Sequence, residues 1–280
     1  MTLDNAVTGL IYLIAVFFLF FIGKIVYDKT HRQFNLREEL VKKDNFAMAL
    51  AVAGYYFGLV IALGGALSGE SAGWMIDTFE ILFYGIITII LLNVSIFIND
   101  KIILGKFDNV KEIVTDQNAG TGVVEAANHI ALGMILYGAM SGEGDWVTAA
   151  VFWILGQAVL VVAGFVYNAM TPFDIHEEIE KDNVAVGVAF AGVLIAIGNI
   201  IRVGAEGDFI SWQVNLSTFA GFVAFGLIML PILRFITDKV LLPGEKLTDE
   251  LINQKKPNVG AGVIEAFAYI GASFLIGWVV

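Results

Sequence analysis

The sequence predicts an all-α polytopic transmembrane bundle of eight helices, built as two parallel four-helix repeats. Of its 280 residues, 58% are apolar and only 15% are charged, and the mean hydropathy is +0.80. A water-soluble globule of this size would have to expose much apolar surface, so a bilayer is its natural solvent. Eight segments are long enough to cross a bilayer, and those of the second half resemble those of the first.

Five spans are uncharged and reach the roughly 18–20 residues that cross a hydrocarbon core of about 30 Å: 45–69, 81–99, 146–173, 183–201 and 209–233. Three further spans contain isolated polar residues: 6–28 with Lys24, 119–141 with Glu125 and His129, and 259–280 with Glu265. No basic region precedes the first apolar run, so we expect an uncleaved first span and not a secretory signal.

The basic residues predict the orientation. Fifteen of the sixteen Lys and Arg residues lie around the first, third, fifth and seventh connections, and only Arg202 lies near an even-numbered one. Because cytoplasmic loops are enriched in Lys and Arg, we expect the odd-numbered loops in the cytoplasm and both termini on the non-cytoplasmic side.

An internal repeat is the strongest signal in the sequence. Residues 44–54 align with 182–192 at an offset of 138, with six of eleven positions identical, and 118–126 align with 258–266 at an offset of 140, with six of nine identical. We therefore divide the chain into repeats at 1–142 and 143–280. Four spans per repeat is an even number, so both repeats face the same way, which predicts a pseudo-two-fold axis along the membrane normal.

The repeated motifs resemble a known family. They are a Glu-Glu-(Leu/Ile) loop leading into Asp-Asn-x-Ala, a second span rich in Ala and Gly, and an Asn-x-Gly start of the fourth span. Together they resemble domain-of-unknown-function family 350, the YjfL-like bacterial inner-membrane proteins, over the full chain as two tandem copies. The resemblance implies a multi-pass protein of the bacterial inner (plasma) membrane and no particular chemistry.

Small residues form a seam on the second span of each repeat. Ala47, Ala51, Gly54 and Gly58 share one helical face, and their counterparts in the second repeat do the same. Such a seam favours close helix packing, and the alternative is a substrate-lining surface.

Glu125 and Glu265 are the main candidates for a functional site. Each lies seven residues beyond an Asn, Asn118 or Asn258, and thus about 10 Å into the membrane. An ionised carboxylate facing lipid at that depth costs a few kcal/mol or more, so each should point into the bundle, carry a proton or meet a partner. The pattern indicates a proton or cation site; the alternatives are a carboxyl that holds a neighbouring helix and a lipid-headgroup contact.

The first repeat carries additional polar residues. His129 follows Glu125 by four residues on the same helical face, where it could share the glutamate's proton, although a lone histidine of this kind is more often structural. Asn128 lies beside it, and Asp77 and Glu80 lie one turn beyond Trp74, where a solvated helix end is the plain interpretation. In the second repeat Tyr269 corresponds to His129 and Ala268 to Asn128, while Asn215 and Thr218 correspond to Asp77 and Glu80.

Four residues stand where spans begin and are expected to cap them: Asp44, Asp182, Asn118 and Asn258. Their side chains can accept hydrogen bonds from the unpaired N–H groups of the first turn.

The functional prediction is an ion- or proton-handling transporter or channel module that uses the two glutamates. The alternative is a non-catalytic membrane scaffold that oligomerises and recruits partners or lipids through its cytoplasmic loops. We find no Walker A loop, no zinc motif and no nucleophile–histidine–acid set, so we expect no enzyme, although an unfamiliar intramembrane active site is a third possibility. The chain has no cysteine, and we predict no cofactor and no metal site.

The partners expected are the lipid bilayer, a proton or cation, and either further copies of the chain or a membrane or cytoplasmic protein. The net charge of −11 argues against nucleic acid.

Overall fold

The computed structural model describes residues 3–103, 105–106, 108–242 and 244–279, and every regular element in these ranges is helical. Eight of the helices are long and apolar enough to cross a membrane, which confirms the predicted class and number of spans. They are α1 (Leu3–Thr30), α2 (Phe46–Gly65), α3 (Trp74–Ile102), α5 (Ala119–Met140), α6 (Trp146–Met170), α8 (Val184–Ala205), α9 (Trp212–Ile236) and α10 (Val259–Val279).

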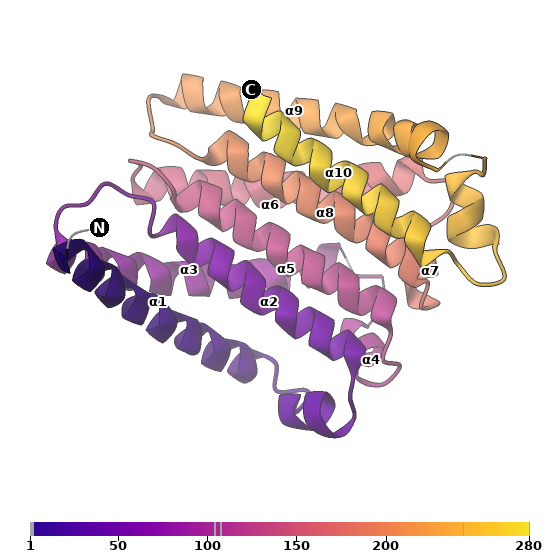
Figure 1. Ribbon diagram of the computed structural model, residues 1–280, viewed down its shortest axis with the longest axis horizontal. Coiled ribbons are helices and arrows are strands. Elements are labelled where there is room, and N and C mark those ends of the chain that lie inside the picture. The colour runs from indigo at the N-terminus through magenta and orange to yellow at the C-terminus, as the bar shows by residue number, and fades with distance from the viewer. Residues whose placement is uncertain (1–2, 104, 107, 243, 280) are drawn as a thin grey trace.

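Short helical segments precede four of these helices and line one end of the bundle, which we call the basic end (Figure 1). They are η1 (Glu38–Lys42), α4 (Asn109–Val114), α7 (Ile175–Glu180) and η3 (Asp249–Asn253), and η2 (Thr237–Leu241) continues α9. The described parts of the chain nearest the N-terminus lie at the opposite end, which we call the acidic end (Figure 1).

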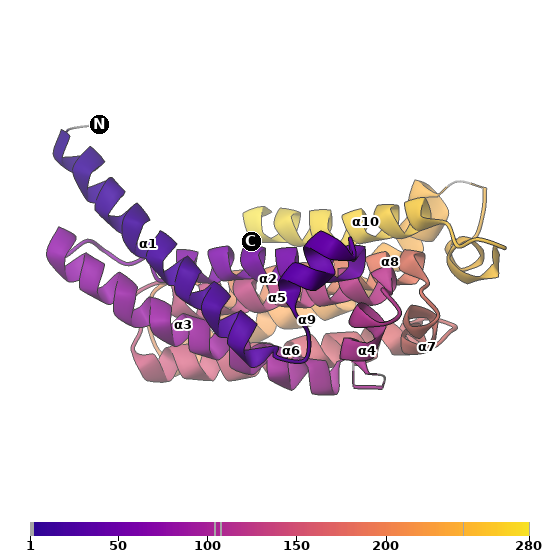
Figure 2. The same cartoon turned by 90° about the horizontal axis from the view of Figure 1, so that it is seen from below.

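The spanning helices form two layers. The front layer is a row in the order α2, α5, α8, α10, so that α5 of the first repeat packs directly on α8 of the second (Figure 1). The back layer contains α1, α3, α6 and α9, and the first half of α1 splays away from the rest (Figure 2). Each repeat therefore contributes two helices to each layer.

Close backbone contacts hold the front row together. A Cβ atom on Gly58 of α2 would lie 2.2 Å from the carbonyl oxygen of His129 in α5, and one on Gly192 of α8 would lie 2.3 Å from Cα of Ala266 in α10. Gly187 makes the equivalent approach between the repeats, toward the Gly120 carbonyl oxygen at 2.7 Å. Small residues permit this spacing because helix association in lipid depends on van der Waals contact.

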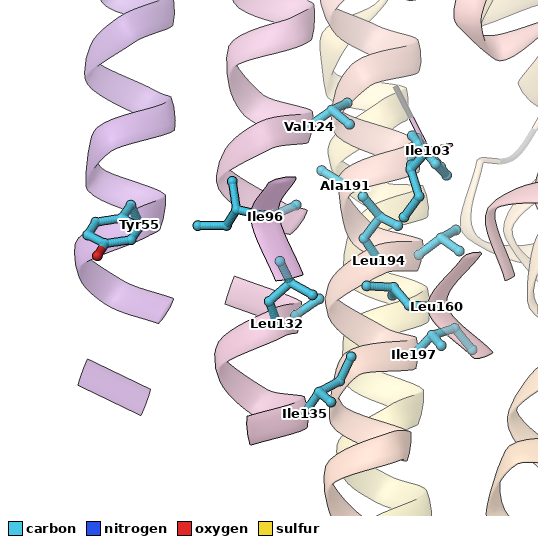
Figure 3. Packing of buried hydrophobic residues seen from close by; sticks show 14 of the residues in the cluster. Tyr55, Ile96, Ile103, Val124, Leu132, Ile135, Leu160, Ala191, Leu194 and Ile197 are labelled. Carbon is cyan, nitrogen blue, oxygen red and sulfur yellow. The ribbon is translucent and has the colours of Figure 1, made fainter. Parts of the chain in front are cut away.

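The apolar core lies between the layers where the two repeats meet. Leu132 and Ile135 of α5 pack with Leu194 and Ile197 of α8, and Leu160 of α6 covers them from the back layer (Figure 3). All five side chains are buried, so the junction between the repeats is as tightly packed as either repeat alone.

The helix caps differ from the sequence prediction at two positions. Asp44 and Asp182 are not the caps: their φ angles are +52° and +58°, and the next residue caps each helix instead. Asn45 accepts a hydrogen bond from Met48 N at 3.0 Å, and Asn183 accepts one from Val186 N at 3.2 Å. The left-handed aspartates reverse the chain between the short segment and the span, which leaves the following Asn in a position to cap.

The caps also reveal a finer repetition than the two predicted copies. Asn118 and Asn258 cap α5 and α10, accepting from Thr121 N at 2.9 Å and Ala261 N at 3.3 Å. In each of the four cases the cap amide also donates to a glutamate of the preceding short segment, namely Glu39, Glu112, Glu178 or Glu250. The bundle is therefore a row of four similar helical hairpins.

Hydrogen bonds also link each hairpin to the next. The amides of Asn45, Asn118 and Asn183 each donate to a backbone carbonyl of the following hairpin, at 2.8 Å to Ile113, 2.8 Å to Ile179 and 2.9 Å to Leu251. The junction between the two repeats thus uses the same bond as the junction within each repeat.

The third span is longer than its uncharged run. The run begins at residue 81, but α3 starts at Trp74 and includes Asp77 and Glu80. Asp77 is buried, and it accepts hydrogen bonds from Tyr12 OH, from Ser71 Oγ at 2.6 Å and from Ala72 N at 2.8 Å. A carboxylate satisfied in this way need not end the helix, and its role is to fix the preceding loop.

Candidate functional site

Glu265 of the second repeat is locked in a buried ion pair. Its side chain is 0% exposed, and its Oε1 lies 2.6 Å from Arg234 Nη1. The hydroxyls of Tyr167 and Tyr269 donate to the same oxygen at 3.3 and 3.2 Å. One cation and two hydroxyls thus compensate the charge of this carboxylate inside the bundle.

Glu125 occupies the equivalent position in the first repeat but has different neighbours. The repeat offsets place Ile96 where the second repeat has Arg234, Tyr27 where it has Tyr167, and His129 where it has Tyr269. Glu125 is 8% exposed. Among the described residues, no Lys, Arg or His forms an ion pair with it.

Asp100 of α3 is the charged group whose electrostatic effect reaches Glu125. The two carboxyls lie close enough for their charges to interact, and Tyr27 is near both. Asp100 Oδ1 is buried without a hydrogen-bond partner in the described structure. Two ionised carboxylates that interact in a low-dielectric interior repel each other, so this pair favours a bound proton or cation.

His129 does not bond to Glu125 in the described structure. Its Nδ1 lies 3.1 Å from the Ala51 carbonyl oxygen of α2, and because a carbonyl only accepts, this nitrogen carries the hydrogen. The ring stands edge-on to Tyr27 and Tyr55, with centroid distances of 6.4 and 6.0 Å. His129 therefore lies on the same face of α5 as Glu125, but its ring contacts the neighbouring helix α2.

Asn128 joins the carboxylate pair to a line of polar groups. Its Oδ1 accepts a hydrogen bond from Asn99 Nδ2 at 3.1 Å, next to Asp100 in α3, while Asn128 Nδ2 and Asn99 Oδ1 have no partner among the described residues. Ser95 and Thr88 lie on the same face of α3 as Asn99. Thr88 is about 16 Å from Asn99 along the helix, toward the acidic end. Ser95 accepts from Trp153 Nε1 at 2.8 Å, and Thr88 Oγ1 is buried without a partner in the part of the chain that the structure describes.

Gln157 of α6 is a further buried polar group. Both of its side-chain polar atoms lack partners among the residues that the structure describes, although the residue is only 7% exposed. Native interiors leave few such atoms unpaired, so these groups indicate an interior built to hold polar species.

Toward the basic end from Glu125 and Asp100, Tyr27 contacts His31. The two rings stack with centroids 4.1 Å apart, and His31 Nδ1 lies 3.0 Å from the Tyr27 carbonyl oxygen. Burial lowers the pKa of His31 from its ordinary value near 6.5, against the opposing effect of that hydrogen bond. His31 is therefore neutral near pH 7, with one ring nitrogen free to accept a proton.

At the acidic end of α3, Glu80 is exposed and lines a cavity of about 700 Å³ between α3 and α6. Leu91, one helical turn before Ser95 on α3, and Trp153 of α6, which donates a hydrogen bond to Ser95, both line this cavity. The cavity and the line of buried polar groups thus follow one another along α3.

The residues fall into two groups. The fold brings Glu125, Asn128 and His129 together on α5, and it keeps Glu265 in a separate cluster formed by α6, α9 and α10. Sequence reasoning missed Asp100 and Arg234 as partners. At the repeat offset of 138, Asp100 aligns with Asp238. The two side chains have different environments, because Asp238 accepts a hydrogen bond from Leu247 N at 2.7 Å.

Within the described ranges, no three His, Asp or Glu side chains converge as metal ligands.

This combination of eight apolar helices, two repeats and intramembrane carboxylates defines a polytopic integral membrane protein. The model of the family Domain of Unknown Function (DUF350) matches residues 1–140 and again 143–280, so the chain belongs to that family as two tandem copies. The resemblance noted from the repeated motifs is confirmed.

Two relatives show both lengths of the family. A UPF0719 transmembrane protein of Aquifex aeolicus (strain VF5) is 23% identical over 271 residues, covering 94% of this chain and 97% of the relative. The UPF0719 transmembrane protein YshE of Bacillus subtilis (strain 168) is 29% identical over 134 residues, covering 48% of this chain and 93% of YshE. No solved structure matches the chain significantly.

Proposed function

We propose that the protein moves protons or small cations across the membrane, and that Glu125 and Asp100 form the binding site. The contrast between the repeats carries this proposal. Glu265 has Arg234 as a counter-ion, whereas in the first repeat the charge of Asp100 acts on Glu125 and no described Lys, Arg or His forms an ion pair with either carboxyl. Such a pair is costly in a membrane interior unless it binds positive charge, and intramembrane carboxyls of this kind mark ion and proton pathways.

The surroundings of the pair support a route toward each end. Toward the acidic end lie Asn99, Asn128 and Ser95, whose amide and hydroxyl groups can pass a proton or coordinate a cation. Toward the basic end lie Tyr27 and the neutral ring of His31. With the expected orientation, the route would connect the outside with the cytoplasm.

Glu265 has a different role in this proposal. Because Arg234 compensates its charge and two tyrosine hydroxyls donate to the same Oε1, it holds α6, α9 and α10 together and takes up no ion, although its Oε2 is buried without a hydrogen-bond partner in the described structure. The proposal therefore assigns transport to the first repeat and assembly to the second.

A flux assay in liposomes tests this division. Purified wild type is compared with the Asp100→Asn/Glu125→Gln variant, using a pH-sensitive dye inside and an imposed proton or sodium gradient. The matched control is Arg234→Gln/Glu265→Gln, which removes the second repeat's pair together and leaves no unpaired charge. We expect loss of flux in the first variant and retained flux in the control.

Equal flux in wild type and the first variant would overturn the proposal. Oligomers that persist in detergent, together with that result, would favour the scaffold predicted as the alternative.

A further inference from the structure

The cavity between α3 and α6 has a composition that the carboxylate pair does not explain. It opens at the acidic end among the connections that follow α2, α5 and α8, and it holds about 700 Å³. That volume lies within the range of about 300–1,000 Å³ that is usual for sites of small organic molecules. A proton or a bare metal cation needs no such space.

The charges around the cavity have one sign. Glu70, Glu80, Glu143 and Asp145 line it, and its described lining contains no Lys, Arg or His. No ion pair among the described residues involves any of these four carboxylates. The cavity therefore repels anions and attracts cations.

The walls are aromatic and apolar. Tyr84 and Phe83 face it from α3, and Trp146 and Trp153 face it from α6. The indole of Trp153 is held by its hydrogen bond to Ser95 at 2.8 Å, so one aromatic wall is fixed in place. The faces of tryptophan and tyrosine rings attract organic cations, and the attraction is largest where water is excluded.

The polar and apolar parts are separated along the membrane normal. Glu80 is near the mouth, while Ile87 and Leu91, on the same face of α3, lie deeper. From Glu80 to Leu91 the helix rises about 16 Å, roughly half of the hydrocarbon thickness. A ligand that fits would carry positive charge at one end and a bulky apolar body below it.

We propose that this cavity is a binding site for a bulky organic cation, with an ammonium or phosphonium centre among Glu80, Glu143 and the aromatic rings. The inference does not depend on the proposed transport function. It predicts that cation binding persists in Asp100→Asn/Glu125→Gln, whose carboxyls lie beyond Trp153.

Tetraphenylphosphonium and tetraphenylborate provide a matched pair of probes, because they share shape and apolar surface and differ in the sign of charge. Binding is measured by equilibrium dialysis of the full chain in nanodiscs, with empty nanodiscs as the background. We expect saturable binding of the phosphonium and none of the borate. Glu80→Gln/Glu143→Gln should weaken phosphonium binding about tenfold, since each carboxylate lies near the surface at an intermediate dielectric.

Two further variants separate charge from space. Ala149→Trp fills the cavity from α6 without changing its charge and should abolish binding, whereas Glu177→Gln removes an exposed carboxylate at the basic end and should leave it unchanged. Helical circular dichroism and elution volume report the folding of each variant. Absence of saturable phosphonium binding to wild type, equal borate binding, or full binding by the Glu80→Gln/Glu143→Gln variant would overturn the inference.

Discussion

Removing Arg234 alone should destabilise the protein far more than removing the whole ion pair. Arg234 is 11% exposed and Glu265 is 0% exposed, so Arg234→Met leaves a buried carboxylate with only two tyrosine hydroxyls. Breaking one side of a buried pair typically costs about 3–5 kcal/mol, whereas replacing both partners by uncharged residues of similar volume is often neutral. We therefore expect a loss of about 3–5 kcal/mol for Arg234→Met and about 1 kcal/mol or less for Arg234→Met/Glu265→Gln.

The free energy of unfolding is measured by denaturant titration of the detergent-solubilised protein, followed by circular dichroism. Glu125→Gln is the matched variant in the first repeat. It should be neutral or stabilising, because it removes a carboxyl that has no cationic partner among the described residues. The reasoning would be refuted if Arg234→Met and the double variant lost equal stability, or if Glu125→Gln cost as much as Arg234→Met.

Four further predictions follow from other features. Gly58→Ala should cost about 2–3 kcal/mol because its Cβ would lie 2.2 Å from a backbone oxygen, while Gly9→Ala, with open space around it, should not destabilise; equal unfolding midpoints would contradict this. Ile96→Arg should place a cation at the position equivalent to Arg234 and stop flux in the liposome assay while the protein stays folded; undiminished flux in a folded variant counts against the site. Because burial lowers the pKa of His31, its proton binds more readily to the unfolded chain, so stability should fall as the pH drops from about 6.5 toward the lower folded pKa. His31→Asn should remove that part of the loss between pH 7.5 and 5 in thermal unfolding, and an identical pH dependence in both proteins would exclude the effect. Reporter fusions at the C-terminus and in the loop 244–257 should report opposite sides of the membrane, and same-side signals would disprove the eight-span topology.

Composition and repetition were sufficient to predict the all-helical class, the eight spans and the two repeats, but not the row of four hairpins. Length and hydropathy define each span, and two alignments at nearly the same offset define the repeats, because both signals are local in the sequence. The cap positions were missed by one residue at Asp44 and Asp182. The motif Asp-Asn offers two capping side chains, and the choice depends on which backbone adopts the left-handed conformation, which the aspartates do.

The partners of the glutamates were beyond the reach of sequence reasoning. Depth along a helix follows from residue counting, so the burial of Glu125 and Glu265 was predictable. Their neighbours depend on the rotation and order of other helices, so Asp100 and Arg234 could not be assigned. The prediction for His129 shows the same limit, because its ring turns to the Ala51 carbonyl of α2, which the contact at Gly58 brings close.

The joining of two units in one chain has a consequence for chemistry. YshE aligns with about one unit, and a protein of that size that associates with its own copy must place the same residues in both halves. An arginine that neutralises one glutamate would then neutralise the other. Fusion removes this constraint: position 234 can hold Arg while position 96 holds Ile, so the two halves can place their glutamates in different surroundings.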